Sequence, residues 1–246
     1  MPVPGFRSST RSAGLLLLGA LLLLQAGCRP VREVAPGPAE VPPVPTEIPA
    51  GYTGYRVVSE ESEVRVLVYR DGPMARLGHN HVLSSRSLRG DVLVGDKGQE
   101  PRVSLVLPVA SFSVDQAELR AEEGEEFPGA VAEDAISGTK KNMLSEALLD
   151  GARFPEIRLT SRKVAGSAPD YTMTVAVEVK GQTHDLQVPV RVEQEAKELR
   201  ASGAFTVTHK ELGLTPFTVM GGLLSVRDEM KLRFRIVARP WHTAAP

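Results

Sequence analysis

The sequence predicts an all-β domain of about eight antiparallel strands. Three observations support this prediction: side chains alternate between apolar and polar with a period of two, short turns separate the alternating segments, and helical spacing occurs in one stretch. Such alternation is typical of strands that bury one face and expose the other to water. The strands therefore form either a sandwich or a closed barrel, and the alternation alone does not choose between them.

The strand segments follow one another along most of the chain after residue 55. In the last of them, "EMKLRFRIVAR", Met230, Leu232 and Phe234 share one face, and Lys231 lies on the other. Pro189 cannot donate a hydrogen bond to a sheet, so we expect a sheet edge or a bulge there. The segments that alternate in this way are residues 63–70, 88–95, 101–108, 156–164, 171–181, 184–192, 199–209 and 229–239.

One stretch, residues 115–150, breaks the β pattern. Its first part is rich in glutamate, and we expect a solvated loop there because a run of like charges is usually exposed. Its second part, "TKKNMLSEALLDG" (139–151), places Leu144 and Leu148 one helical turn apart and ends in glycine. A single helix across one end of the sheet is therefore expected.

The composition argues against a nucleic-acid partner. The 246-residue chain has 29 Lys and Arg residues against 30 Asp and Glu residues, whereas nucleic-acid binding calls for a basic surplus on one face. Aromatic residues make up 5% of the chain, which is too few for platforms on which bases stack. The apolar share of 42% fits one globular domain.

The N-terminus has the pattern of an export signal. Two arginines precede an apolar run, Leu15–Ala26, which is too short to span a bilayer and is followed by glycine and Cys28. This arrangement resembles a bacterial lipoprotein signal, in which residues 1–27 are removed and Cys28 is lipidated. The alternative is an ordinary signal peptide that is cut nearby and leaves an idle thiol. Because Cys28 is the single cysteine, the exported domain has no internal disulfide.

A proline-rich segment, residues 28–52, follows the signal and predicts an extended tether. The domain is expected over residues 53–240, with a short C-terminal tail over residues 241–246. Together these features predict an exported protein on the periplasmic side of a bacterial membrane, attached through a lipid anchor at Cys28. The sequence leaves open which membrane holds the anchor and whether two copies pair as a homodimer.

The stretch "RLGHNH", residues 76–81, is the main candidate for chemistry, because His79 and His81 lie one residue apart. A metal- or haem-binding site would need these two with His184 or His209, since zinc takes three or four ligands. The simpler interpretation is a turn whose imidazoles bond to the backbone or to a ligand headgroup. The chain has no nucleophile elbow and no phosphate-binding glycine loop, so we expect neither catalysis nor a cofactor.

Several stretches together, in this order and spacing, resemble the YceI-like family. They are "SEVRVLVYR" leading into "RLGHNH", "MLSEALLDGARFPEIRLTS", "VKGQTHDLQVPVRV" and "ASGAFTVTHKELGLTPFTVMGGLLSVRDEMKLRFRI". The resemblance covers about residues 55–238, and its most specific parts are "LDGARFPEI" and "THKELGLTPF". It implies an eight-stranded, lipocalin-like antiparallel barrel with one capping helix and export across the inner membrane. It also implies an apolar interior that binds a polyisoprenoid, such as a quinone tail or a prenyl phosphate.

The inward faces of the strands would then line the lipid site. Ala201 and Gly203 are small residues in mid-strand, which leaves room for a cavity, although the same faces equally fit a filled core. A filled core would make the domain an interaction module without a ligand. The predicted lining residues are Val66, Val68, Leu105, Leu107, Met173, Val175, Phe205, Leu232 and Phe234.

The mouth of such a barrel would hold the headgroup. We expect Arg76, His79 and His81 to lie there and to donate hydrogen bonds to a phosphate or quinone oxygen. The loop "GLTPFTVMGG" adds Phe217 and Met220, either as a flexible lid or as a hydrophobic plug.

Overall fold

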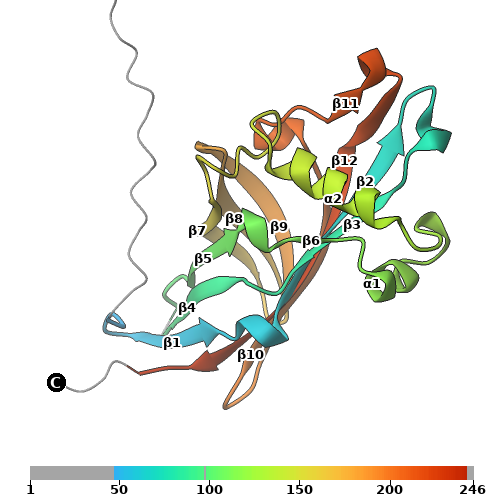
Figure 1. Ribbon diagram of the computed structural model, residues 1–246. Helices are drawn as coiled ribbons and strands as arrows, with labels where there is room; N and C mark the ends of the chain where they lie inside the picture. The colour runs from blue at the N-terminus through green and yellow to red at the C-terminus, as the bar shows by residue number, and fades with distance from the viewer. Residues whose placement is uncertain (1–46, 97, 243–246) are drawn as a thin grey trace, which may run out of the picture. The chain divides into compact units, whose positions relative to one another are not determined.

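Figure 1 shows the structure of the chain, a computed structural model that describes residues 47–96 and 98–242. The predicted signal (residues 1–27), Cys28 and most of the predicted tether (28–52) lie outside the described residues. No helix in the described part of the chain is long and apolar enough to cross a membrane.

Eight antiparallel strands close into a barrel, which confirms the predicted fold class. The order around the barrel is β1, β4, β5, β7, β8, β9, β10 and β12, and β12 pairs again with β1. The choice between sandwich and barrel is thereby settled, because the pairing of β12 with β1 gives every strand of the ring two neighbours. The barrel strands are β1 (Tyr52–Val57), β4 (Arg89–Gly95), β5 (Arg102–Pro108), β7 (Glu156–Ser167), β8 (Asp170–Val179), β9 (Gln182–Gln194), β10 (Leu199–Thr208) and β12 (Leu224–Pro240).

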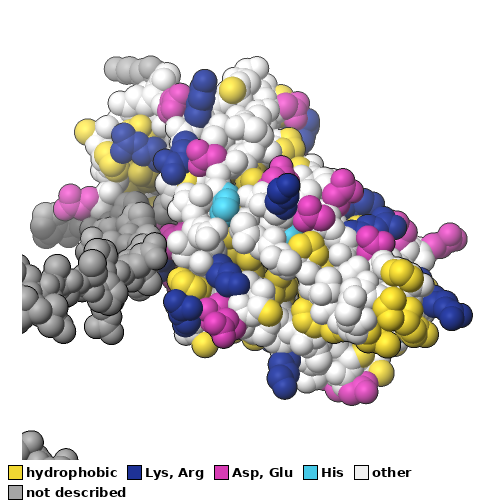
Figure 2. Space-filling view, turned by 90° about the horizontal axis from the view of Figure 1, so that it is seen from above, with side chains coloured by type: hydrophobic (Ala, Val, Ile, Leu, Met, Phe, Trp, Pro, Cys, Tyr) yellow, Lys and Arg dark blue, Asp and Glu magenta, His cyan; other side chains and the backbone are white. Residues whose placement is uncertain are grey.

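The longest strand, β12, belongs to two parts of the sheet. Its C-terminal end pairs with β1, whereas its earlier part pairs with β2, and a β-bulge lies between Val226 and Met230. Strands β2, β3 and β6 extend the sheet beyond the closed ring, and β11 pairs with the start of β12. Figure 2 views the domain from this end. The four strands are β2 (Glu63–Asp71), β3 (His81–Ser85), β6 (Ser113–Val114) and β11 (Thr218–Val219).

Helices connect the strands, and α2 covers one end of the barrel as predicted (Figure 1). The α-helices are α1 (Ala117–Glu122) and α2 (Glu133–Leu144). The 3-10 helices are η1 (Ser59–Glu61), η2 (Ala75–Leu77), η3 (Val109–Ser111), η4 (Gly124–Glu126), η5 (Lys210–Leu212) and η6 (Met220–Gly222).

The bounds of α2 differ from the predicted ones, which were residues 139–151. The helix ends at Leu144, whose carbonyl oxygen accepts the N–H of Gly151 at 3.0 Å, so the chain closes a turn where another helical turn was expected. Leu148 packs against the core from this turn. The spacing between Leu144 and Leu148 therefore matches a helical turn, although the helix ends before Leu148.

Gly203 of β10 lies opposite Phe234 of β12, and the space beside it is filled. A Cβ at Gly203 would lie 2.6 Å from the Phe234 ring and would also clash with the carbonyl oxygen of Pro189. The glycine thus makes room for the phenyl ring and does not enlarge the interior. The β9–β10 ladder ends at Arg191, so Pro189 lies beside an unpaired edge, as expected.

Replacing Gly203 by alanine is expected to lower the free energy of unfolding by about 1–3 kcal/mol, because Phe234 or the backbone must move. Urea unfolding measures the change. Gly138→Ala is the matched control, since Gly138 lies inside α2 with no other atom close to its added Cβ. That control should gain about 0.5–1 kcal/mol. Equal midpoints for Gly203→Ala and the unchanged protein would contradict the close approach.

The C-terminal end of the domain reaches past β12. Trp241, which the sequence placed in a tail (241–246), donates its backbone N–H to the carbonyl oxygen of Gly54 at 3.0 Å. The guanidinium of Arg56 stacks over the indole, 4.2 Å from its centroid. Trp241 is therefore part of the folded domain.

Candidate functional site

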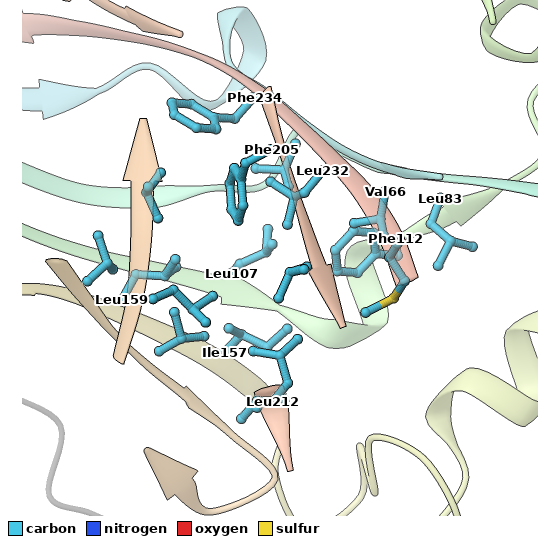
Figure 3. A pocket seen from close by; sticks show the side chains of 18 of the residues that line it. Val66, Leu83, Leu107, Phe112, Ile157, Leu159, Phe205, Leu212, Leu232 and Phe234 are labelled. Carbon is cyan, nitrogen blue, oxygen red and sulfur yellow. The ribbon is translucent and has the colours of Figure 1, made fainter. Parts of the chain in front are cut away.

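The barrel encloses a cavity of about 460 Å³. Inward-facing side chains of most barrel strands form its wall, together with residues of β2, β3 and α2. A volume in this range is typical of pockets that hold small-molecule ligands. Figure 3 shows the apolar side chains that point into this cavity, among them Val66, Leu83, Leu107, Phe112, Ile157, Leu159, Phe205, Leu212, Leu232 and Phe234.

The alternation of side chains along β2 places one positively charged side chain, that of Arg70, at the cavity. Val64, Val66 and Val68 face the interior, and Arg70 lies on the same face two residues later. Its Nη1 donates a hydrogen bond to the carbonyl oxygen of Gly78 at 2.7 Å. Arg70 was not among the predicted site residues, although the alternation along β2 would have identified it.

Most residues that the sequence predicted to contact a ligand line the cavity. The two that do not are Arg76, which is exposed on η2, and Met220, which is exposed on η6. Arg76 was predicted at the mouth and Met220 in a lid or plug over it. Neither lines the cavity, because the short helices turn their side chains out to solvent. The predicted site residues that line the cavity are Val66, Val68, His79, His81, Leu105, Leu107, Met173, Val175, Phe205, Phe217, Leu232 and Phe234.

The cavity reaches the surface at the end where β2, β3 and β11 lie. Arg70, His79 and Val219 line the cavity and are also exposed to solvent. This mouth therefore combines hydrogen-bond donors with an apolar side chain. Such a mouth offers a polar headgroup its partners while an attached apolar chain lies in the interior.

His81 is held in place by a buried carboxylate. Asp115, whose side chain is completely buried, accepts a hydrogen bond from His81 Nδ1 at 2.6 Å. The same carboxylate accepts the Val82 N–H at 2.9 Å and Nη1 of the buried Arg120 at 2.6 Å. Because Asp115 occupies Nδ1, Nε2 is the ring nitrogen that His81 offers to a ligand.

At Asp115, hydrogen bonds together lower the pKa of the carboxyl by more than burial raises it. Burial alone would raise the pKa of this carboxyl, but the bonds from His81, the Val82 N–H and Arg120 hold the pKa below its ordinary value. Asp115 also has a left-handed backbone with φ of +53°, which costs a non-glycine residue about 1–2 kcal/mol. Sequence reasoning missed this residue, because it follows β6 and is separated from His81 by 34 positions.

Hydrogen bonds of Asn80 hold the stretch "RLGHNH" against its neighbours. Its side-chain Oδ1 accepts the Arg70 N–H at 3.0 Å, and its Nδ2 donates to the carbonyl oxygen of Glu126 at 2.7 Å. Arg120 Nη1 donates to the Asn80 carbonyl oxygen at 2.7 Å. The stretch is thus a turn, as one interpretation expected, but the His81 ring bonds to a carboxylate and not to the backbone.

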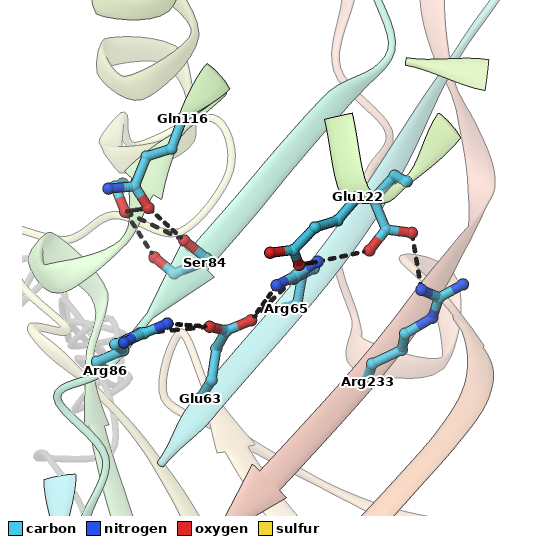
Figure 4. Close-up of polar contacts among 9 residues, drawn as sticks. Glu63, Arg65, Ser84, Arg86, Gln116, Glu122 and Arg233 are labelled. Atoms are coloured by element: carbon cyan, nitrogen blue, oxygen red, sulfur yellow. Dashed lines mark hydrogen bonds and ion pairs between the residues drawn. The ribbon is translucent and has the colours of Figure 1, made fainter. Parts of the chain in front are cut away.

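Ion pairs hold α1, which carries Arg120, against the outer face of the sheet (Figure 4). Glu123, whose side chain is 2% exposed, accepts hydrogen bonds from Arg65 of β2 and Arg233 of β12, both at 2.8 Å. Glu63 also pairs with Arg65. The expected solvated loop is therefore wrong for this part of the acidic stretch, because its pairing arginines come from distant strands.

The metal-binding alternative gains no support. Among the described residues, no three histidine, cysteine, aspartate or glutamate side chains are grouped where they could hold a metal ion. The rings of His79 and His81 lie 6.3 Å apart, and His209 Nδ1 bonds to the carbonyl oxygen of Asp228 at 2.9 Å. His184 does not line the cavity.

One solved structure, that of BcnA, supports the fold. The crystal structure of BcnA from Burkholderia cenocepacia is similar with a TM-score of 0.53 and 16% sequence identity, covering 74% of this chain and 98% of that one. A crystal structure of a YceI protein from Campylobacter jejuni is 11% identical with a TM-score of 0.39, covering 56% of this chain and 71% of that one. No curated protein matches the sequence significantly.

The sequence also matches a family model directly. The match is to the YceI-like domain and covers residues 55–238, which is most of the described structure. The likeness to BcnA agrees with this match at the level of the barrel. The chain belongs to the YceI-like family, whose barrel fold binds hydrophobic ligands.

Proposed function

We propose that this protein holds an isoprenoid lipid, such as a quinone tail or a prenyl phosphate, inside its barrel at the cell envelope. The observation that carries the proposal is the apolar cavity of about 460 Å³, which reaches the surface beside Arg70 and His79. An isoprenoid lipid has a long apolar chain with a polar group at one end, and the cavity has the same division.

The apolar wall accounts for affinity without catalysis. Each buried methylene contributes about 0.8 kcal/mol, so ten of them contribute about 8 kcal/mol before the cost of immobilising the ligand. About fifteen methylenes contribute about 12 kcal/mol, and if immobilisation costs about 4 kcal/mol, the remaining 8 kcal/mol corresponds to a dissociation constant of about 1 μM. Binding of this kind needs a shaped apolar interior and few polar groups.

The mouth provides the contacts for the headgroup. Arg70 carries a permanent positive charge there, and His81 is oriented by the buried Asp115. Charge-assisted hydrogen bonds to a phosphate are stronger than those to a neutral carbonyl. Arg70 can donate to either headgroup, and His81 Nε2 donates to a phosphate when its ring is protonated. A prenyl phosphate gains more from the Arg70 charge.

The location of the protein is part of the proposal. Export and a lipid anchor at Cys28 are expected from the sequence, and both depend on residues outside the described part. A tethered barrel would meet its lipid at the surface to which it is anchored, since a polyisoprenoid has little solubility in water.

Native mass spectrometry of the full-length protein, purified in mild detergent, tests the proposal. We expect about one retained isoprenoid per chain, identified after solvent extraction. Metal analysis of the same sample tests the alternative use of the histidines. A protein that carries no lipid and takes up none when offered would contradict the proposal.

Replacing both His79 and His81 by alanine is expected to weaken binding of a prenyl phosphate by about tenfold or more, because charge-assisted hydrogen bonds contribute about 1.5–3 kcal/mol each. Titration with a fluorescent prenyl phosphate measures the change. His242→Ala is the matched control, since His242 is an exposed histidine that does not line the cavity. Unchanged affinity in the double variant would remove the headgroup role from these histidines.

A further inference from the structure

Exposed hydrophobic side chains gather beside the cavity mouth. Leu77 is 57% exposed, Met220 59%, Leu223 43% and Val219 37%. These four residues, here called the apolar tip, are the large hydrophobic residues that stand out as exposed in the described structure. Figure 2, which views the domain from this end, shows hydrophobic side chains collected in patches on the surface. Val219 also lines the cavity, so the tip and the mouth are continuous.

Two segments far apart in the sequence form the tip. The Met74 N–H donates to the carbonyl oxygen of Leu223 at 2.9 Å, which joins the η2 segment to the η6 segment. Gly78, next to Leu77, lies against the side chain of Leu224. The tip is therefore one surface, although its two parts are more than a hundred residues apart.

The backbone projects the second part of the tip outwards. Met220, Gly221 and Gly222 have φ values of +53°, +65° and +90°, and a Cβ at either glycine would meet no other atom. A methionine in a left-handed conformation costs about 1–2 kcal/mol relative to an ordinary one. The strained turn exposes the Met220 side chain, so burial of that side chain does not offset the cost of the left-handed backbone.

The charge around the tip fits a lipid surface. Residues 72–79 ("GPMARLGH") and 215–226 ("TPFTVMGGLLSV") contain no aspartate or glutamate, and their one arginine, Arg76, is exposed. Acidic side chains would be repelled by anionic headgroups, whereas an arginine is attracted to them. Long basic side chains beside apolar ones are typical of surfaces that lie in the bilayer interface.

We propose that the apolar tip inserts into the interface of a phospholipid bilayer and presents the cavity mouth to the membrane. Leu77, Met220 and Leu223 enter the boundary between headgroups and acyl chains, and Arg76 contacts phosphate groups. Docking of this kind needs ordinary phospholipid alone, so it goes beyond the isoprenoid binding proposed above. Docking would also let the apolar chain of a lipid pass from the membrane into the cavity without crossing water.

Tryptophan quenching in the full-length chain tests the insertion. The chain has one tryptophan, Trp241, near Gly54 and distant in sequence from the tip, so Met220→Trp combined with Trp241→Phe places a single reporter at the tip. Vesicles of phosphatidylcholine and phosphatidylglycerol, without isoprenoid, carry bromine on their acyl chains. We expect the indole at position 220 to shift its emission to the blue and lose most of its fluorescence.

Matched variants separate tip insertion from other attachment. The apolar run Leu15–Ala26 of the full chain can itself bind vesicles, so co-sedimentation alone does not report on the tip. Thr206→Trp with Trp241→Phe places the reporter on an exposed side of β10, where we expect little quenching. Adding Leu77→Ser and Leu223→Ser to the tip reporter should reduce the quenching several-fold.

Two results would overturn the proposal. One is an unquenched tip reporter on protein that sediments with the vesicles. The other is a blue shift that depends on protein concentration and needs no vesicles, which would assign the tip to pairing between copies of this chain. Isoprenoid retention is measured on the tip reporter, Met220→Trp with Trp241→Phe. An unquenched reporter on protein that retains isoprenoid contradicts insertion alone, and a quenched reporter on protein that retains none contradicts the binding proposal alone.

Discussion

Replacing Asp115 by asparagine is expected to lower the free energy of unfolding by about 3–5 kcal/mol, because it leaves the buried guanidinium of Arg120 without a counter-charge. It also removes the partner that orients His81. Urea unfolding at neutral pH measures the loss. Asp170→Asn is the matched control: Asp170 pairs with Arg191 in solvent, and its loss should change stability by less than about 1 kcal/mol.

The effect of Asp115 should depend on pH in a defined direction. Its pKa is lowered in the folded protein, so its contribution is present above the ordinary aspartate pKa of about 4 and is lost as the pH falls through the lower folded value. The stabilities of the unchanged protein and Asp115→Asn should therefore converge in acid. Adding Arg120→Met to Asp115→Asn should restore part of the loss at neutral pH. Two single variants with additive effects would contradict the coupling.

Replacing Ala201 by phenylalanine is expected to abolish lipid retention. Ala201 lies on the cavity wall in β10, and a phenyl ring there would displace several methylenes of the ligand. At about 0.8 kcal/mol for each methylene, loss of four of them weakens binding by about 200-fold. Native mass spectrometry of the variant and titration with a fluorescent isoprenoid measure the loss.

The neighbouring residue supplies the control. Ser202→Phe adds the same ring to the exposed face of the same strand, and retention should stay near that of the unchanged protein. Circular dichroism and urea unfolding establish that both variants are folded, since overpacking costs about 1–3 kcal/mol. Full retention by folded Ala201→Phe would place the lipid outside the cavity.

The strand faces could be predicted from the sequence because they depend on local alternation. On β12, Met230, Leu232 and Phe234 face the cavity as the pattern predicted. The closure of the ring could not be predicted in this way, since β12 divides its edge between β1 and β2 and the pattern carries no information on partners. The end of α2 was missed because Leu148 packs on the core from a turn.

The candidate site likewise has one part that could be predicted from the sequence and one part that could not. Its apolar wall follows from period-two alternation, so most predicted lining residues face the cavity. Its polar part depends on contacts between distant segments: Asp115 reaches His81 from beyond β6, and Arg76 is turned to solvent by η2. Arg70 could have been found from its register on β2.

The pairing of β1 with β12 has a consequence for the order of folding. Ser62 Oγ bonds to the Val237 carbonyl oxygen across 175 positions, and β1 pairs with the same end of β12. Contacts so distant in sequence form late, because the chain between them must first lose its freedom. The ring cannot close until β12 has been synthesised. We therefore expect a growing chain of this design to stay open until translation has reached its last strand.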